Sequence, residues 1–221
     1  PISGLQINKA SDNAAGLAIA DKLRTQASSL TQATENGNSA VAMLQIADQA
    51  MAEQSNILDI IKTKLVQAAT DTTSSDGRDA LAKDMEKLLT QIDNISKDTN
   101  YNGIALISDG TTTGASTVKT FQMGENTTTT ITLAAGIAAN VAGFDISGAA
   151  SITDGATSRA MLSKLDLALT SLNNMRGDVG STQNQIESSV RNLEVRTVNL
   201  KAAESVIRDV DYAAESANFN K

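Results

Sequence analysis

The chain has 221 residues and a formal net charge of −7, and 41% of its residues are hydrophobic but only 2% aromatic, with no cysteine and no histidine. These numbers exclude disulfides, thiol catalysis, histidine acid–base chemistry and the usual zinc sites. An acidic chain also lacks the clustered Lys and Arg that bind nucleic acid or an anionic membrane, and no apolar run approaches the ~20 residues of a membrane span. We therefore expect no cofactor, no nucleic acid and no membrane partner.

The first residues, 1–11, are rich in Gly, Ser and Asn and predict a turn or an extended arm. Asp12 or Asn13 is placed to cap a short helix from Ala14 to about Ser28. Because the sequence starts at Pro1 inside this segment, we expect a fragment trimmed from a longer chain.

A second, long helix is predicted from about Leu30 to near Thr70, and its apolar residues from Leu30 to Ala68 alternate at spacings of three and four without a proline. It would be on the order of 60 Å long at ~1.5 Å per residue. An ordinary helical bundle is the alternative, but the sustained seam favours a long rod-like bundle. The seam positions are Leu30, Ala33, Gly37, Ala40, Leu44, Ala47, Met51, Gln54, Leu58, Ile61, Leu65 and Ala68.

A polar loop over 71–77 separates this helix from another that starts near Arg78 and returns antiparallel onto it. Its expected apolar stripe is Leu81, Met85, Leu88, Ile92 and Ile95. The dipeptide Asn102-Gly103 then supplies the positive φ of a turn.

The middle of the chain, 108–157, changes to Thr, Ser, Gly and Ala without a helical period. Alternation over 118–123 and 127–133, around a turn at 124–126, predicts a β-hairpin. A helical turn is expected at Ala138–Val141. We expect this β-rich segment where the chain turns round.

The last helix is predicted to start after a cap at Ser158 and to run past Arg208. Gly177 and Gly180 lie within it and cost about 1 kcal/mol each relative to Ala, so either close packing offsets this cost or the helix bends there. The expected seam, including four polar positions expected to fix register, is Leu162, Leu165, Leu169, Leu172, Arg176, Val179, Gln183, Ile186, Val190, Leu193, Thr197, Leu200, Glu204 and Ile207.

These elements predict a mainly α fold, a long antiparallel, coiled-coil-like helical bundle with a small β-hairpin region. Residues 1–107 would form the arm and two helices, 108–157 the hairpin and loops, and 158–221 the last helix of the same domain. The mechanism of such a protein is packing rather than chemistry, so we expect no catalytic, cofactor or metal residues.

The chain resembles bacterial flagellin, the subunit of the flagellar filament. The similar segments occur in the family's order on both sides of the middle. They are SGLQIN (3–8), DNAAGLAIA (12–20), DNI (93–95), TNYNG (99–103), FQMG (121–124), MRGDVGSTQNQ (175–185) and IRDVDYAAE (207–215).

The resemblance implies an extracellular protein, exported by the flagellar secretion apparatus, that polymerises with itself into a helical tube for motility. It also implies an export chaperone and a cap protein as partners, terminal helices beyond both ends, and a variable outer domain that is nearly absent here. Heterologous contacts that do not close into a ring give such a tube. Our candidates for these contacts are Ser3, Gly4, Leu5, Ile7 and Asn8 in the arm.

Residues 58–67 lie where many flagellins carry LQRIRELAVQ, the patch recognised by the vertebrate Toll-like flagellin receptor. Ile60, next to Asp59, replaces the family's arginine, and Lys64 replaces a leucine. The change removes a bidentate donor and places a charge in an apolar contact. Weak or evaded recognition by this host innate immune receptor is one hypothesis, and variation without immune meaning is the other.

Other patterns have structural explanations. Acids at 76, 79, 84 and 86 suit a helix start rather than catalysis. The family resemblance suggests O-linked sugars in the middle segment, although simple loop hydrophilicity explains the same hydroxyls. The candidate residues are Thr111, Thr112, Thr113, Ser147 and Ser151.

Two alternatives to a filament subunit stay open. A hook–filament junction protein shares similar terminal helices, and a flagellin-like carbohydrate-binding surface protein could use the same scaffold. The scarcity of aromatic residues disfavours a sugar-stacking platform.

Overall fold

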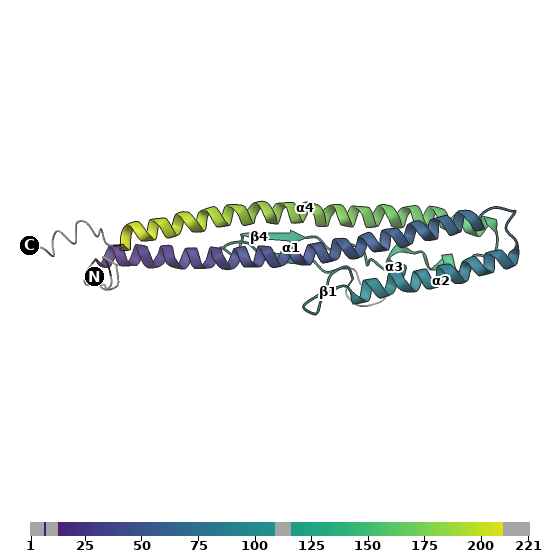
Figure 1. The fold of residues 1–221 in the computed structure, drawn as a ribbon, viewed down its shortest axis with the longest axis horizontal. Coiled ribbons are helices and arrows are strands. Elements are labelled where there is room, and N and C mark those ends of the chain that lie inside the picture. Colours follow the sequence, from purple (N-terminus) through teal and green to yellow (C-terminus); the bar gives the residue numbers. More distant parts are fainter. Residues whose placement is uncertain (1–6, 8–12, 109–115, 210–221) are drawn as a thin grey trace, which may run out of the picture. The chain divides into compact units, whose positions relative to one another are not determined.

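The computed structural model describes Ile7, residues 13–108 and residues 116–209 (Figure 1). Its helices are α1 (Ala14–Ala68), α2 (Ser75–Asp98), α3 (Val141–Phe144) and α4 (Gly155–Arg208), with a 3-10 helix, η1, at Ser147–Ser151. Its strands form two pairs, β1 (Asn100–Tyr101) with β2 (Ile104–Ala105) and β3 (Lys119–Gln122) with β4 (Thr130–Leu133). The mainly helical fold with a small β-hairpin region is therefore confirmed.

The described chain divides into two compact units, and α1 and α4 contribute to both. Unit 1 comprises the chain up to Ser39, Phe121–Ile131 and the chain from Gln185. Unit 2 comprises Ala40–Thr120 and Thr132–Asn184.

Unit 1 pairs the first part of α1 with the last part of α4. The two run antiparallel, because the Ile7 amide donates to the Arg208 carbonyl at 3.4 Å while Gly37 faces Val190. Small residues such as Ala27 and Ala33, both buried, allow this close approach. The tip of the β3–β4 hairpin is fixed to α1 by the Asn36 amide, which donates to the Gln122 carbonyl at 3.1 Å.

Unit 2 packs the rest of α1 against α2 and the first part of α4. The helices α1 and α2 are antiparallel, because a later residue of α1 contacts an earlier residue of α2. The Gln54 amide donates to the Ile92 carbonyl, whereas Lys64 pairs with Asp84 at 3.2 Å. The same holds for α4, where Asp48 pairs with Arg176 at 2.8 Å and Lys62 with Asp166 at 2.7 Å. Both neighbours of α1 are thus antiparallel to it, as expected.

The seam of α1 is buried at every predicted position from Leu30 to Ala68. It also continues toward the N-terminus through Ala27 and Ala20, which are 3% and 0% exposed. The predicted boundary near Ser28 is wrong, because α1 is continuous from Ala14. Local hydroxyls do not break it, since Ser29 and Thr31 donate to the carbonyls of the preceding turn.

The seam of α4 lies one residue earlier than predicted at several places. Met161, Ala168 and Thr182 are buried, whereas the predicted Leu162, Leu169 and Gln183 are only half-buried. The predicted polar seam positions Arg176, Gln183, Thr197 and Glu204 are all half-buried as well. On α2 the buried positions lie one residue later than predicted, since Leu89 and Ser96 are buried in place of Leu88 and Ile95.

The helix starts also differ from the predictions. Ser74 caps α2, accepting a hydrogen bond from the Gly77 amide, so the helix begins before Arg78. Asp154 caps α4 by accepting from the Thr157 amide at 2.7 Å. Ser158 is therefore not the cap; it is buried inside the first turn and its hydroxyl donates to the Asp154 carbonyl.

The middle of the chain keeps the predicted hairpin but not its predicted place. The tip of the β3–β4 hairpin belongs to unit 1, whereas the chain reverses between α1 and α2 in unit 2. The expected helical turn at Ala138–Val141 is found three residues later as α3, capped by the Asn140 side chain. The Asn102-Gly103 turn has the predicted positive φ, 50° and 76°, and joins β1 to β2.

Candidate functional site

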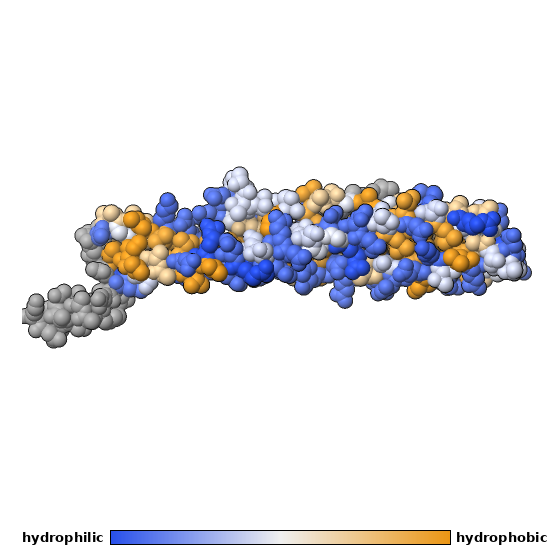
Figure 2. Space-filling view, turned by 90° about the horizontal axis from the view of Figure 1, so that it is seen from above, coloured by the Kyte–Doolittle hydropathy of each residue, from blue (hydrophilic) through white to orange (hydrophobic). Residues whose placement is uncertain are grey.

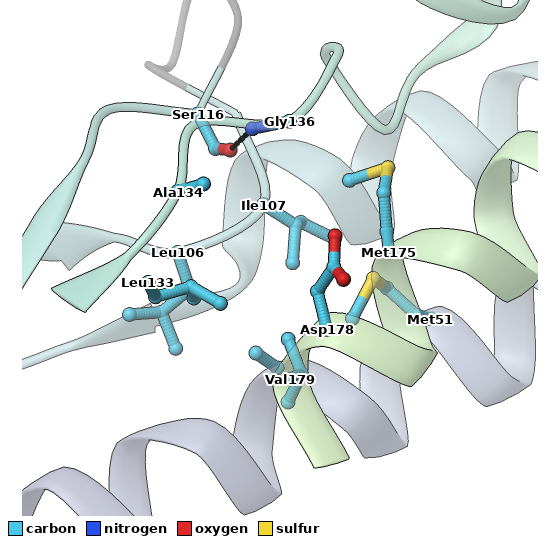
Figure 3. A pocket seen from close by; sticks show the side chains of 11 residues that line it. Met51, Leu106, Ile107, Ser116, Leu133, Ala134, Gly136, Met175, Asp178 and Val179 are labelled. Carbon is cyan, nitrogen blue, oxygen red and sulfur yellow. Dashed lines mark hydrogen bonds between the residues drawn. The ribbon is translucent and has the colours of Figure 1, made fainter. Parts of the chain in front are cut away.

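A small, mostly apolar hollow of unit 2 lies between α1, α4 and the segment from β4 to Gly136 (Figure 3). It measures about 30 Å³, enough for a few waters rather than for a substrate, which needs hundreds of Å³. The Ser116 hydroxyl at its edge accepts a hydrogen bond from the Gly136 amide at 2.9 Å. The side chains around it include Met51, Leu106, Ile107, Leu133, Met175 and Val179.

The one glutamine on the α1 seam, Gln54, joins separate parts of unit 2. Its side-chain amide donates to the Ala139 carbonyl at 2.7 Å and to the Ile92 carbonyl at 3.2 Å, and the residue is fully buried. Its carbonyl oxygen has no hydrogen-bond partner among the described atoms. The sequence shows only a polar residue at one position of this seam, whereas the structure shows that it joins α2 and the Ala139 loop to α1.

Two charged groups have altered acidity. The Thr157 amide and hydroxyl, which donate to its carboxylate, lower the pKa of Asp154 at the start of α4. The hydrogen bond from its guanidinium to Asp48 raises the pKa of Arg176. Both pKa shifts stabilise the charged form of the group. Each shift moves the pKa further from neutral pH, whereas a general acid–base catalyst needs a pKa near the working pH.

The segment compared with the receptor patch lies on α1 in unit 2. Ile60 is 47% exposed and Asp59 is exposed. Lys64 is half-buried because its ammonium pairs with Asp84 of α2. The two substituted positions therefore differ, since one offers an apolar surface and the other a charge already engaged within the chain.

The candidate subunit contacts and sugar sites are only partly described. Ile7 is 6% exposed and its side chain packs near Gly16, so it contacts its own chain. Ser147 and Ser151 lie on η1 and are exposed. The other candidates, Ser3, Gly4, Leu5, Asn8, Thr111, Thr112 and Thr113, lie outside the described residues.

Close packing does not explain Gly177 and Gly180 of α4. A Cβ atom built on either would meet no heavy atom within 4 Å. The expectation that packing offsets their helix cost is therefore wrong for the single chain. Gly37 shows the opposite situation, since its Cβ would lie 2.5 Å from the Val190 side chain and 2.8 Å from that of Met123.

Residues 13–108 and 116–209 have neither a metal-binding cluster nor a membrane-spanning helix. No group of three or more acidic side chains there is placed to hold a metal ion. No helix in this part of the chain is both long and apolar enough to cross a membrane.

The fold defines a mainly α protein built on long packed helices, and comparison with known proteins identifies its family. Residues 2–112 match the bacterial flagellin N-terminal helical region and residues 162–221 match the C-terminal helical region. The chain belongs to the bacterial flagellin family. The family is one of structural proteins, so the assignment agrees with the expectation that the chain is not an enzyme.

Relatives of different length match the chain differently. Flagellin B of Helicobacter pylori J99 is 48% identical over 58% of this chain, but the match spans only 24% of that protein. The flagellar filament 33 kDa core protein of Treponema phagedenis is 32% identical over 99% of this chain and 80% of its own length. The chain thus spans about a quarter of the Helicobacter relatives and most of the Treponema one.

Two solved structures are similar. Bacillus cereus flagellin has a TM-score of 0.61 at 27% identity and covers 77% of this chain and 94% of that one. A structure assigned as a flagellar hook-associated protein of Vibrio parahaemolyticus has a TM-score of 0.71 at 13% identity, covering 89% and 99%. At such low identity the second likeness shows the fold alone.

Proposed function

We propose that this chain is a structural subunit of the bacterial flagellar filament, outside the cell, where it polymerises with itself into a helical tube for motility. The observation that carries the proposal is that the two flagellin-matched ends form one antiparallel packed pair of helices. A relative matching nearly the full chain is named a flagellar filament core protein. Copies joined by heterologous contacts that do not close would grow as an open helix.

The partners follow from this role. The chain would be exported by the flagellar secretion apparatus with the help of a chaperone and would be added under a cap protein. The arm, including Leu5 and Asn8, would contribute to contacts between subunits. Ile7 has a different place in this scheme, because its side chain is already buried in its own chain.

Seeded growth tests the proposal. A protein in which this chain carries flagellin terminal helices at both ends should extend short filament seeds into long tubes under the electron microscope. Failure of the intact protein to extend seeds would overturn the filament role. Extension that stops after one layer would favour the hook–filament junction alternative.

We also propose weak recognition by the vertebrate Toll-like flagellin receptor. The support is that Ile60 places an apolar side chain, not an arginine, on an exposed surface, and that Lys64 is engaged by Asp84. The double variant Ile60→Arg/Lys64→Leu should reach half-maximal signalling in a receptor reporter cell at a concentration at least about tenfold lower than the parent needs. Full-strength signalling by the parent would contradict the proposal.

A carbohydrate-binding role has less support. The larger open groove of unit 1, about 690 Å³ between the β3–β4 hairpin and α4, is lined by Thr, Ser, Gln and Asn side chains and by Met123 and Ile131, without an aromatic ring on which a sugar would stack. A glycan array would test this role if seeds fail to grow.

A further inference from the structure

The chain contains two Asn-Gly dipeptides, Asn36-Gly37 in unit 1 and Asn102-Gly103 in unit 2, and their surroundings are opposite. An asparagine side chain that precedes glycine is open to attack by the next backbone nitrogen, because glycine has no Cβ atom in the way. The attack also requires backbone movement at both residues. The folded structure therefore decides whether either dipeptide reacts.

The Asn36-Gly37 dipeptide is held in place from several sides. It lies inside the continuous helix α1, where backbone amides are bonded along the helix. The Asn36 side chain is bonded at both ends, since its amide donates to the Gln122 carbonyl at 3.1 Å and its oxygen accepts from the Gln32 amide at 3.2 Å. Gly37 is buried, and a Cβ atom there would lie 2.5 Å from Val190. Movement of the Asn36 side chain onto the Gly37 nitrogen would break these contacts.

The Asn102-Gly103 dipeptide is the exposed turn between β1 and β2, which Figure 1 shows as a loop at the end of α2. Each strand has only two residues, so few ladder hydrogen bonds hold the turn closed. The Gly103 nitrogen donates to the Asn100 side-chain oxygen at 3.3 Å, which is a long and exposed hydrogen bond. A Cβ atom at Gly103 would meet no heavy atom within 4 Å. The turn can therefore open locally while the packed helices stay in place.

We infer that Asn102 is a site of spontaneous deamidation. The Gly103 nitrogen forms a bond to the carbonyl carbon of the Asn102 side chain, and the bond from that carbon to the side-chain nitrogen breaks. The proton lost by the attacking nitrogen leaves with the side-chain nitrogen as ammonia, and the product is a five-membered cyclic imide. Water then adds to one of the two imide carbonyls and opens the ring, which leaves either aspartate or isoaspartate at this position. No group is oxidised or reduced, and water is the co-reactant.

Both products change the turn. Either one adds a negative charge to a chain whose net charge is already −7. Isoaspartate also routes the backbone through the side-chain carbon and so lengthens the turn by one atom. The turn has φ values of 50° at Asn102 and 76° at Gly103, and a longer backbone is expected to break the pairing of Asn100 with Ala105 that this geometry closes. The inference goes beyond the proposed function and does not depend on the filament role.

Peptide mapping by mass spectrometry tests the inference on the purified protein. The folded chain is incubated at mildly alkaline pH, where the attacking nitrogen loses its proton more readily, and fragment ions time the loss of amide at both dipeptides. We expect Asn102 to be converted at least about tenfold faster than Asn36, because only its turn opens locally. Equal rates at the two positions would overturn the inference, and so would no conversion at either position over the time in which the unfolded chain is converted.

The unfolded chain is the matched control. In guanidinium chloride the two dipeptides lose their different surroundings, so Asn36 and Asn102 should be converted at rates within about twofold of each other. A tenfold difference that persists after unfolding would mean that the neighbouring residues in the sequence cause it, and this would overturn the structural basis of the inference.

Two variants identify the reacting group and the bond that restrains it. N102D has no amide to lose at this position, so the peptide that contains the turn should show no increase in mass. An increase at the parent's rate in N102D would assign the reaction to another residue and overturn the inference. N100A removes the acceptor of the Gly103 N–H, so conversion at Asn102 should become at least about twofold faster. An N100A rate no faster than the parent's would overturn the restraint assigned to this hydrogen bond.

Discussion

At the residue scale, Gln54 shows how a polar side chain can hold a helical seam together. Its amide supplies two hydrogen bonds to carbonyls of different segments in a fully buried place. A buried carbonyl without a donor costs the desolvation of that group, which exceeds the net value of an exposed hydrogen bond. The seam therefore tolerates this glutamine because two carbonyls accept its amide, although its own buried carbonyl oxygen has no partner among the described atoms.

Replacing this side chain should destabilise unit 2. Gln54→Leu keeps the volume and apolar character of the seam but removes both donors, so the free energy of unfolding should fall by about 1–3 kcal/mol. Gln91→Ala on the exposed side of α2 is the control and should change it by less than about 0.5 kcal/mol. Urea unfolding measures both. A more stable Gln54→Leu protein would contradict the role given to these hydrogen bonds.

The cap of α4 gives a prediction about pH. The lowered pKa of Asp154 means that the folded state favours the charged form, so its contribution is complete above its ordinary value of 3.8 and is lost as the pH falls through the lower folded value. Asp154→Asn caps at any pH. The gap in stability between parent and variant should therefore shrink on acidification from about pH 6 to pH 2, followed by urea unfolding at each pH. A gap of constant size would show that the carboxylate charge has no part in the cap.

At the element scale, the glycines of the long helices have opposite surroundings. Gly177 and Gly180 open onto free space, whereas Gly37 lies against Val190 and Met123. An identical substitution should therefore have opposite effects on the two kinds of site.

Gly177→Ala and Gly180→Ala should each stabilise the monomer by about 1 kcal/mol, because alanine restricts the unfolded chain and meets nothing in the folded one. Gly37→Ala should destabilise it by about 1–3 kcal/mol, because Val190 is stiff and cannot turn away from the new methyl group. Thermal unfolding of the monomers measures all three. Destabilisation by Gly177→Ala would mean that this side of α4 is covered in the monomer.

At the scale of the whole molecule, α4 is less completely covered after Leu193 than along its first part. The space-filling view shows hydrophobic surface over this end of the helix (Figure 2). In unit 2, the α4 residues Leu165, Ala168 and Leu172 are at most 2% exposed. In unit 1, Thr197, Leu200 and Ile207 occupy the corresponding seam positions and are only half-buried. Fewer buried apolar contacts give a lower free energy of local opening.

Amide hydrogen exchange should follow this difference. In the monomer, amides of residues 197–207 should exchange at least about tenfold faster than those of residues 161–172. Filament growth should reduce this ratio of exchange rates if a second copy covers residues 197–207 of α4. Mass spectrometry of peptides from each segment measures both values. Uniform protection along α4 in the monomer would contradict the difference in local stability.

The sequence determined the helices and the seam of α1, because a three–four alternation of apolar residues can be buried on one side only of a long helix. It also determined the family, the β3–β4 hairpin and the Asn102-Gly103 turn, whose positive φ values depend on local chemistry. Tertiary structure decided which of two neighbouring columns on α4 is buried, since Leu162 and Met161 are both apolar and only the folded chain, which places Met161 beside Gly148, selects between them. It decided the role of Gln54 and the open space at Gly177, because the sequence records neither the acceptors nor the gaps that residues distant along the chain create when they pack.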